Sequence, residues 1–285
     1  MHALTPAAER LTARLTQPPP ALGVFLPAGF PAPGLDVETL RLLADAGADI
    51  LEIGLPTPHA PLDGPTIREA NRQSLAHGTR TEHVLATVRR TAETTDAIVL
   101  VMTYWEPVRV YGPQFAHDLA AAGAAGALIP DLPPPAVAAW TAAVRAAGLH
   151  NLQFVPRNGT DQELSTQTAT ASGWLYAPAA TEPTGYQGQL DIPALRAFTG
   201  RLRQHSDVPV VTGVGVSTPE LASLVSPFVS AVVVGSPIVR CLLHHPGAAG
   251  RLAAADATAI FADSVRHPAT AAEIGEGSHH GSPPR

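Results

Sequence analysis

Two acidic residues, Glu52 and Asp63, lie close together in the sequence in settings that suit different chemical roles. Glu52 interrupts the apolar run 51–56, which is typical of a buried strand, and Asp63 lies in the loop sequence Asp-Gly-Pro-Thr-Ile that follows. Because burial raises the pKa of a carboxyl group, Glu52 is expected to act as a general acid or base near neutral pH. Asp63, in a wetter loop, is expected to stay ionised and to accept a hydrogen bond. The pair predicts an acid–base site at the carboxyl end of a strand.

Two purely structural roles compete with this prediction. Glu52 would pair with an arginine, and Asp63 would cap the helix that begins near Pro65. The structural alternative is weaker for Glu52, because lone acids on apolar strands are uncommon.

Short apolar runs alternate with Ala-rich helical patterns along the chain, and this order sets the elements that must position the acids. The predicted strands are Leu22–Ala28, Asp49–Leu55, Ala97–Tyr104, Gly126–Pro130, Asn151–Val155, Trp174–Ala177, Val208–Gly213 and Ala231–Gly235. The predicted helices are Val37–Ala46, Pro65–His77, Pro113–Ala122, Pro134–Ala147, Asp161–Ala171, Ile192–His205, Pro219–Val225, Pro237–His244 and a last helix that ends near Arg266. About eight βα units over roughly 250 residues predict an α/β fold, the (β/α)8 TIM barrel, rather than an open sheet.

The composition indicates one domain. The chain has 285 residues, 45% of them hydrophobic, and no shift in composition divides it. We predict a barrel domain over residues 1–268, with an extra N-terminal helix near Ala7–Leu15. The segment 269–285 is rich in Gly, Ser, His and Pro and is predicted to be a disordered tail.

Several classes of function are excluded by composition. The net charge of -6 and the lack of a basic run argue against nucleic acid, and the chain shows no secretory signal or membrane-length apolar span, so a cytoplasmic protein is expected. The chain contains no lysine, which excludes Schiff-base chemistry and pyridoxal phosphate bound to lysine. Cys241 is the single cysteine, so neither an intramolecular disulfide nor a cysteine-based zinc cluster forms. We predict no metal and no organic cofactor.

Two glycine-containing segments follow the last two predicted strands. They are 213–217, with the sequence Gly-Val-Gly-Val-Ser, and 235–238, with the sequence Gly-Ser-Pro-Ile. Glycine lets backbone N–H groups approach an anion closely, and the helix that begins near Pro237 adds its positive end. One such segment alone is explained by a tight turn, but two at successive strand ends predict a phosphate site.

Taken together, these motifs resemble the tryptophan synthase alpha subunit family over about residues 22–239. The most specific parts are the segment 46–56, Ala-Gly-Ala-Asp-Ile-Leu-Glu-Ile-Gly-Leu-Pro, and the loop 63–67 at the family's own spacing. The resemblance implies a lyase of aromatic amino acid biosynthesis. It implies retro-aldol cleavage of indole-3-glycerol phosphate to indole and glyceraldehyde 3-phosphate, without a metal or organic cofactor.

The resemblance also assigns roles to residues of this chain. Glu52 falls on the general acid/base, Asp63 on the acid that binds the indole N–H, and Tyr176 on a tyrosine beside the substrate. The substrate-binding positions are Phe25, Tyr104, Leu128, Ile129 and Thr184, and the phosphate-binding positions are Gly185, Gly213, Gly215, Gly235 and Ser236. For the two tyrosines, plain core packing is an equal alternative.

Three loops depart from the family pattern. His59 replaces a loop carboxylate, the segment 179–185 lacks the family's lid arginine and first glycine, and the segment 105–109 differs where the family contacts its beta subunit. The departures put communication with a beta subunit in doubt and favour a stand-alone indole-releasing enzyme over an alpha chain of a complex. The alternative is a catalytically weak binding or allosteric partner of a beta subunit. A sugar-phosphate isomerase shares the phosphate site but not the spacing of the two acids.

Overall fold

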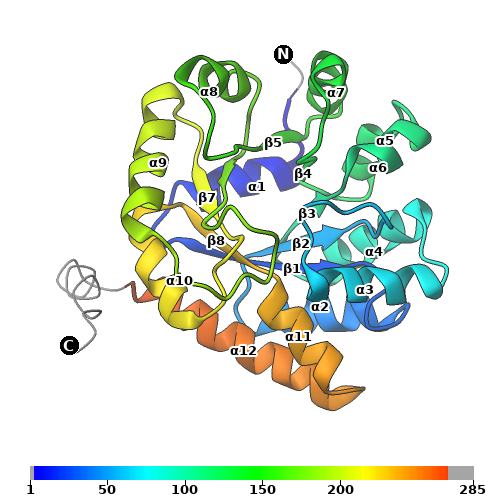
Figure 1. Ribbon diagram of the computed structural model, residues 1–285. Coiled ribbons are helices and arrows are strands. Elements are labelled where there is room, and N and C mark those ends of the chain that lie inside the picture. Colours follow the sequence, from blue (N-terminus) through cyan, green and yellow to red (C-terminus); the bar gives the residue numbers. More distant parts are fainter. Residues whose placement is uncertain (1–2, 269–285) are drawn as a thin grey trace, which may run out of the picture.

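The computed structural model describes residues 3–268, and its centre is a closed barrel of eight parallel strands in sequential order (Figure 1). The (β/α)8 fold predicted from the sequence is therefore confirmed. The strands are β1 (Ala21–Pro27), β2 (Ile50–Gly54), β3 (Ile98–Met102), β4 (Gly126–Leu128), β5 (His150–Phe154), β6 (Leu175–Ala177), β7 (Val210–Thr212) and β8 (Ala231–Val234).

Helices surround the barrel on its outside (Figure 1). They are α1 (Pro6–Leu15), α2 (Leu35–Asp45), α3 (Pro65–Ala76), α4 (Thr81–Thr94), α5 (Trp105–Tyr111), α6 (Phe115–Ala121), α7 (Pro134–Ala146), α8 (Asp161–Thr168), α9 (Ile192–His205), α10 (Pro219–Val225), the short 3-10 helix η1 (Ser226–Phe228), α11 (Ser236–His244) and α12 (Ala248–Arg266). Every helix expected from the sequence is present, with ends that differ by a few residues.

Two α-helices, α4 and α5, and the short 3-10 helix η1 were not predicted. Helix α4 buries side chains at helical spacing, and these are Val84, Thr87, Val88 and Thr91. Because two of the four are threonines, the sequence lacks the apolar periodicity that predicts a helix. Helix α5 is only seven residues long and was predicted to be a loop. It occupies the rim of the barrel between β3 and α6.

Strand alternation decides which side chains enter the barrel. On β2, Leu51 and Ile53 belong to the core between strands and helices, so Glu52 between them faces the interior. Glu52 stands in register with Phe25 of β1 and Leu100 of β3. The rest of the barrel interior is filled mainly by apolar side chains, which makes it a packed core rather than a channel.

Helix α1 closes the amino-terminal end of the barrel. Its Leu11 and Leu15 are buried in the same cluster as Ile50 and Ile98, the first residues of β2 and β3. The predicted N-terminal helix therefore completes the barrel core. The opposite, carboxyl end is left for the site.

His150, the first residue of β5, links this strand to α1. Its Nε2 lies 3.0 Å from the Ala8 carbonyl oxygen and 2.9 Å from Thr12 Oγ1, and burial lowers the pKa of the imidazole. The unfolded chain therefore binds a proton more readily than the folded one. We expect the contribution of His150 to the free energy of unfolding to be constant above about pH 6.5, the ordinary pKa of a histidine in the unfolded chain. The free energy of unfolding should decrease as the pH falls below this value. Urea unfolding from pH 8 to 5 tests this, and a slope that is the same in His150→Gln would contradict it.

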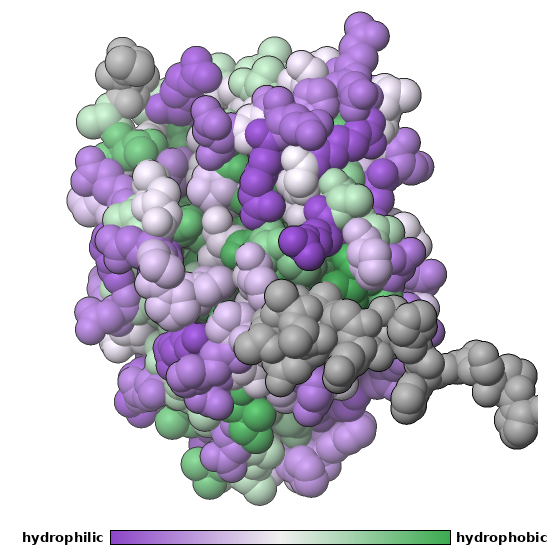
Figure 2. All heavy atoms as spheres, turned by 90° about the vertical axis from the view of Figure 1, so that its left-hand side faces the viewer, coloured by the Kyte–Doolittle hydropathy of each residue, from purple (hydrophilic) through white to green (hydrophobic). Residues whose placement is uncertain are grey.

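Other predictions fall partly outside the described structure. The tail 269–285, and with it the predicted boundary at residue 268, lies outside the described residues. Within residues 3–268, no helix is long and apolar enough to cross a membrane, and no three His, Cys, Asp or Glu side chains are grouped to hold a metal ion. On the face over α9 and α10, hydrophobic residues are scattered among hydrophilic ones (Figure 2), as expected where the apolar stripe of each helix faces the barrel.

Candidate active site

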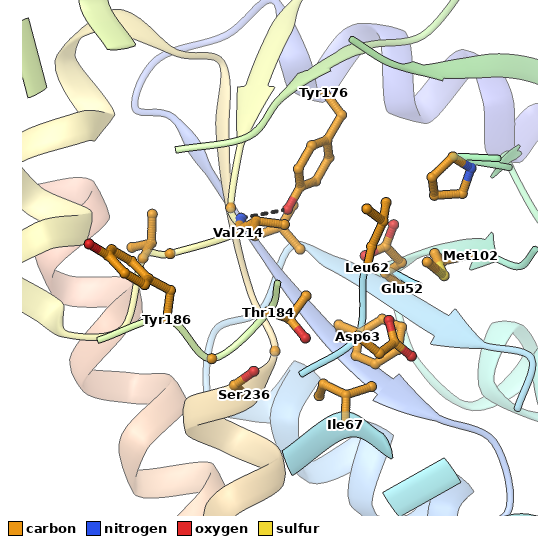
Figure 3. A pocket seen from close by; sticks show the side chains of 18 of the residues that line it. Glu52, Leu62, Asp63, Ile67, Met102, Tyr176, Thr184, Tyr186, Val214 and Ser236 are labelled. Atoms are coloured by element: carbon orange, nitrogen blue, oxygen red, sulfur yellow. Dashed lines mark hydrogen bonds between the residues drawn. The ribbon is translucent and has the colours of Figure 1, made fainter. Parts of the chain in front are cut away.

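A pocket opens at the carboxyl end of the barrel and contains both predicted acids (Figure 3). This is the end at which barrels of this kind keep their chemistry. The predicted site residues that line it are Phe25, Glu52, Asp63, Leu128, Tyr176, Thr184, Gly185, Gly213, Gly215, Gly235 and Ser236. Further lining residues that sequence reasoning did not select include Leu62, Ile67, Met102, Phe154, Tyr186, Val214 and Val233.

Glu52 is a buried polar group of the pocket. Its side chain is 4% exposed, and its Oε1 has no hydrogen-bond partner among the described residues. Burial, with a smaller contribution from the negative charge of Asp63, raises the pKa of Glu52 to about 8. A carboxyl group in this setting exchanges a proton near neutral pH, which is the property that a general acid/base needs.

Asp63 is held by two donors from different elements. Tyr104 Oη donates to one carboxylate oxygen at 2.9 Å, and Asn71 Nδ2 donates to the other at 2.9 Å. The predicted wetter environment of Asp63 is wrong, because its side chain is only 4% exposed and burial raises its pKa. The two hydrogen bonds and the charge of Arg68 act in the opposite direction and favour the carboxylate.

Neither structural alternative for the acids is observed. No described arginine pairs with Glu52 Oε1, which accepts no hydrogen bond at all. Helix α3 begins after Gly64, and its N-cap has no side-chain hydrogen bond, so Asp63 does not cap it. Both acids are therefore available to a ligand in the pocket.

Tyr176 connects the acidic end of the pocket to the glycine loop after β7. Its hydroxyl oxygen accepts the Val214 N–H at 3.0 Å (Figure 3), and Phe154 stacks on its ring with centroids 5.8 Å apart. Burial and the nearby Glu52 raise the pKa of Tyr176, so the hydroxyl keeps its proton. The side chain packs in the core and has its O–H near Glu52, and its place beside the substrate stays a prediction.

The predicted phosphate end lies where the loops after β6, β7 and β8 meet. Ser236 is 5% exposed and begins α11, and its Oγ has no partner among the described residues. Gly185 and Gly215 both have a positive φ, 85° and 97°. Gly185 lies against Ser236 of α11, and Gly215 packs against Ala180 of the loop after β6. An unpaired buried hydroxyl at the start of a helix, beside glycine backbone, suits an anion.

The residues of the pocket thus match an acid–base site next to an anion site, and comparison with known proteins identifies the family. The sequence model of the family described as tryptophan synthase alpha chain matches residues 13–265. The chain belongs to this family.

Individual tryptophan synthase alpha chains cover most of this chain. The Streptomyces coelicolor protein is 37% identical over 245 residues, 86% of this chain and 90% of that protein, and the Streptomyces avermitilis protein is 38% identical over 84% and 86%. Among solved structures, Mycobacterium tuberculosis tryptophan synthase matches with a TM-score of 0.82 and 32% identity, covering 93% of this chain and 99% of that one. The alpha subunit from Legionella pneumophila matches with a TM-score of 0.82 and 27% identity, covering 92% and 99%.

Membership of the tryptophan synthase alpha family confirms the function expected from the resemblance. The family consists of lyases that cleave indole-3-glycerol phosphate to indole and glyceraldehyde 3-phosphate. The alternative of a sugar-phosphate isomerase is therefore wrong.

Two residues assigned through the family resemblance lie outside the pocket lining. The Tyr104 hydroxyl contacts two residues of the pocket lining: it donates to the Asp63 carboxylate and accepts the Leu62 N–H at 3.2 Å. Ile129 packs in the core outside the barrel, whereas Leu128 belongs to the inner cluster. One step along a strand turns a side chain to the other face, so only one of the two neighbours enters the pocket.

Some of the missed residues carried a usable signal. Met102 and Phe154 are the last residues of β3 and β5, and strand ends of a barrel line its site. Asn71 carried none, because its contact with Asp63 depends on how α3 packs.

Proposed function

We propose that this chain cleaves indole-3-glycerol phosphate with Glu52 as general acid/base and Asp63 as the acceptor of the indole N–H. The observation that carries the proposal is the buried, unpartnered Glu52, whose pKa is raised to about 8, beside a carboxylate with two donors. In the proposed complex, the substrate phosphate accepts hydrogen bonds from the backbone N–H groups near Gly185 and Gly215 and from the Ser236 hydroxyl.

The cleavage needs one proton delivered and one removed. Protonated Glu52 gives its proton to the ring carbon that carries the glycerol chain, which places positive charge on the ring. Asp63 stabilises this charge through the indole N–H. The Glu52 carboxylate then takes the proton of the adjacent chain hydroxyl as the carbon–carbon bond breaks and its electrons return to the ring. Indole and the aldehyde form, and Glu52 is protonated again.

This mechanism predicts a pH dependence. Free enzyme must carry the proton on Glu52, so kcat/KM is expected to be level below pH of about 8 and to fall tenfold per pH unit above it. Steady-state indole release between pH 6 and pH 10 measures the profile. A kcat/KM that rises through pH 8 would contradict the assignment, because it would require the ionised form of Glu52.

Indole release by the purified chain alone tests the proposed function itself. We infer that the chain turns over without activation, so a tryptophan synthase beta subunit added in excess should change kcat little. Large stimulation would instead identify the chain as the alpha part of a complex. No release in either condition would reject the lyase proposal.

Two of the three departures from the family pattern lie beside each other at one rim of the barrel. The hydrogen bond from Arg109 lowers the pKa of Glu106 on α5, and the exposed His59 is close enough to contribute a little to the same effect. The changed loop after β2 and the changed segment after β3 are therefore neighbours. Val110 on the same helix is 71% exposed. We infer that this rim decides whether a beta subunit binds, while the pocket decides the chemistry.

A further inference from the structure

The loop between β6 and α9, residues 178–191, covers the pocket and lacks any arginine of its own. Thr184 and Tyr186 of this loop line the pocket, and Figure 3 shows Tyr186 across it from Glu52 and Met102. The middle of the loop is tied to the loop after β2. The Thr184 N–H donates to the Leu62 carbonyl at 2.9 Å, and the Gly64 N–H donates to Thr184 Oγ1 at 2.8 Å.

The start of the covering loop is hydrogen-bonded to an arginine in the loop after β5. Arg157, in the loop after β5, donates from Nη1 to the Ala179 carbonyl at 3.0 Å. The next residue, Ala180, donates its N–H to the Val214 carbonyl at 2.8 Å in the glycine loop after β7. Arg157 is half-buried and therefore partly shielded from water.

The end of the covering loop contacts α11, the helix that begins at the predicted phosphate position. With its side-chain oxygen turned toward α11, Gln187 accepts from both terminal nitrogens of Arg240, at 2.7 and 2.9 Å. Arg240 lies one helical turn after Ser236, so this contact joins the loop to the same helix that begins at the phosphate position. Arg240 forms no ion pair with any of the described acidic residues.

We propose that Arg157 and Arg240 are positioning residues that hold the covering loop closed over the pocket in the isolated chain. They act from outside the loop, one at each end, where hydrogen bonds from a charged guanidinium are stronger than neutral ones. The consequence for substrate binding rests on the proposed function. If only a fraction of the chains is closed, the apparent affinity falls by that fraction, so opening the loop raises KM and leaves kcat nearly unchanged.

Hydrogen exchange of the free protein tests the closed loop without reference to catalysis. In the wild type, the amides of Ala180 and Thr184 should exchange slowly, since both donate hydrogen bonds. Arg157→Ala and Arg240→Ala should each speed exchange of peptides from 178–191 about tenfold or more. Unchanged exchange in both variants would overturn the proposal, whether or not the chain releases indole.

Steady-state kinetics test the consequence for substrate. KM for indole-3-glycerol phosphate should rise about tenfold in each variant with kcat within about twofold. Faster loop exchange with an unchanged KM would show that the contacts hold the loop but not the substrate. A wild type without indole release would reject the lyase proposal, while the exchange result would still decide the role of the arginines.

Matched variants separate the contact from its charge. Arg240→Lys keeps the charge but loses the two-pronged donation to Gln187, so it should behave like Arg240→Ala. If lysine restored the wild-type KM, a general attraction for phosphate would explain the effect instead. Combining Gln187→Ala with Arg240→Ala should add little to either change alone. Arg196→Ala, an exposed position on α9, serves as the control expected to change neither exchange nor KM.

Discussion

Replacing Glu52 by glutamine is expected to lower the rate of indole release by about 10²–10⁴-fold, the usual contribution of a general acid/base. Glutamine has nearly the same shape but can neither deliver a proton to the ring carbon nor take one from the hydroxyl. The measurement is single-turnover and steady-state indole release at pH 7. The matched control is Glu93→Gln, an exposed glutamate on α4, which should leave the rate unchanged.

The same substitution should make the fold more stable at alkaline pH. Glu52 has a folded-state pKa of about 8 against an ordinary value of 4.5, so between these values the folded chain binds more protons than the unfolded one. The part of the cost of its burial that comes from ionisation is therefore absent below about pH 4.5 and greatest above about pH 8. Glu52→Gln should raise the free energy of unfolding at pH 8 by up to about 4 kcal/mol and change it little at pH 5. An inactive variant that is less stable at pH 8 would mean that the site, and not only its chemistry, was lost.

Replacing Asp63 by asparagine should cost about 10²–10³-fold in kcat, as expected when a charge that stabilises the transition state is removed. Tyr104 and Asn71 both donate to this carboxylate, so an amide there would also leave one donor facing an N–H group. Because the charge of Asp63 helps to raise the pKa of Glu52, the alkaline fall in kcat/KM should move to lower pH in Asp63→Asn. Rate profiles from pH 6 to 10 measure both effects.

Asp256→Asn, an exposed position on α12, is the charge-matched control for this variant. A variant at Asp63 that keeps the wild-type rate would remove the acid from the mechanism. A lower rate with an unmoved pH profile would keep its role toward the indole N–H, but would show that its charge does not act on Glu52.

These results also bear on the alternative of a catalytically weak binding partner. A chain that had lost its chemistry would gain stability by giving up a buried acid, because an unpaired polar group in the barrel is costly. The retained Glu52, with an oxygen that has no hydrogen-bond partner, is instead what a working site requires. A robust wild-type rate that is lost in Glu52→Gln would exclude the binding-partner alternative.

The sequence by itself determined the features that depend on local pattern. Alternation along β2 places Glu52 inside the barrel, and the order of apolar and Ala-rich segments predicts a closed barrel. Glycine segments after β7 and β8 predict the phosphate end, because two such segments at successive strand ends place backbone N–H groups where barrels of this kind bind phosphate. The same logic failed where polar residues fill apolar positions, as the buried threonines of α4 show.

Only the tertiary structure decided the features that join distant segments. Asp63 is buried rather than exposed to water because Asn71 from α3 and Tyr104, which follows β3, pack around it. The covering loop lacks an arginine in its own sequence, but it is contacted by Arg157 from the loop after β5 and by Arg240 from α11, through contacts that span 22 and 53 positions. Local patterns fix which face a side chain occupies, but burial, pKa and loop closure depend on neighbours that only the closed barrel brings together.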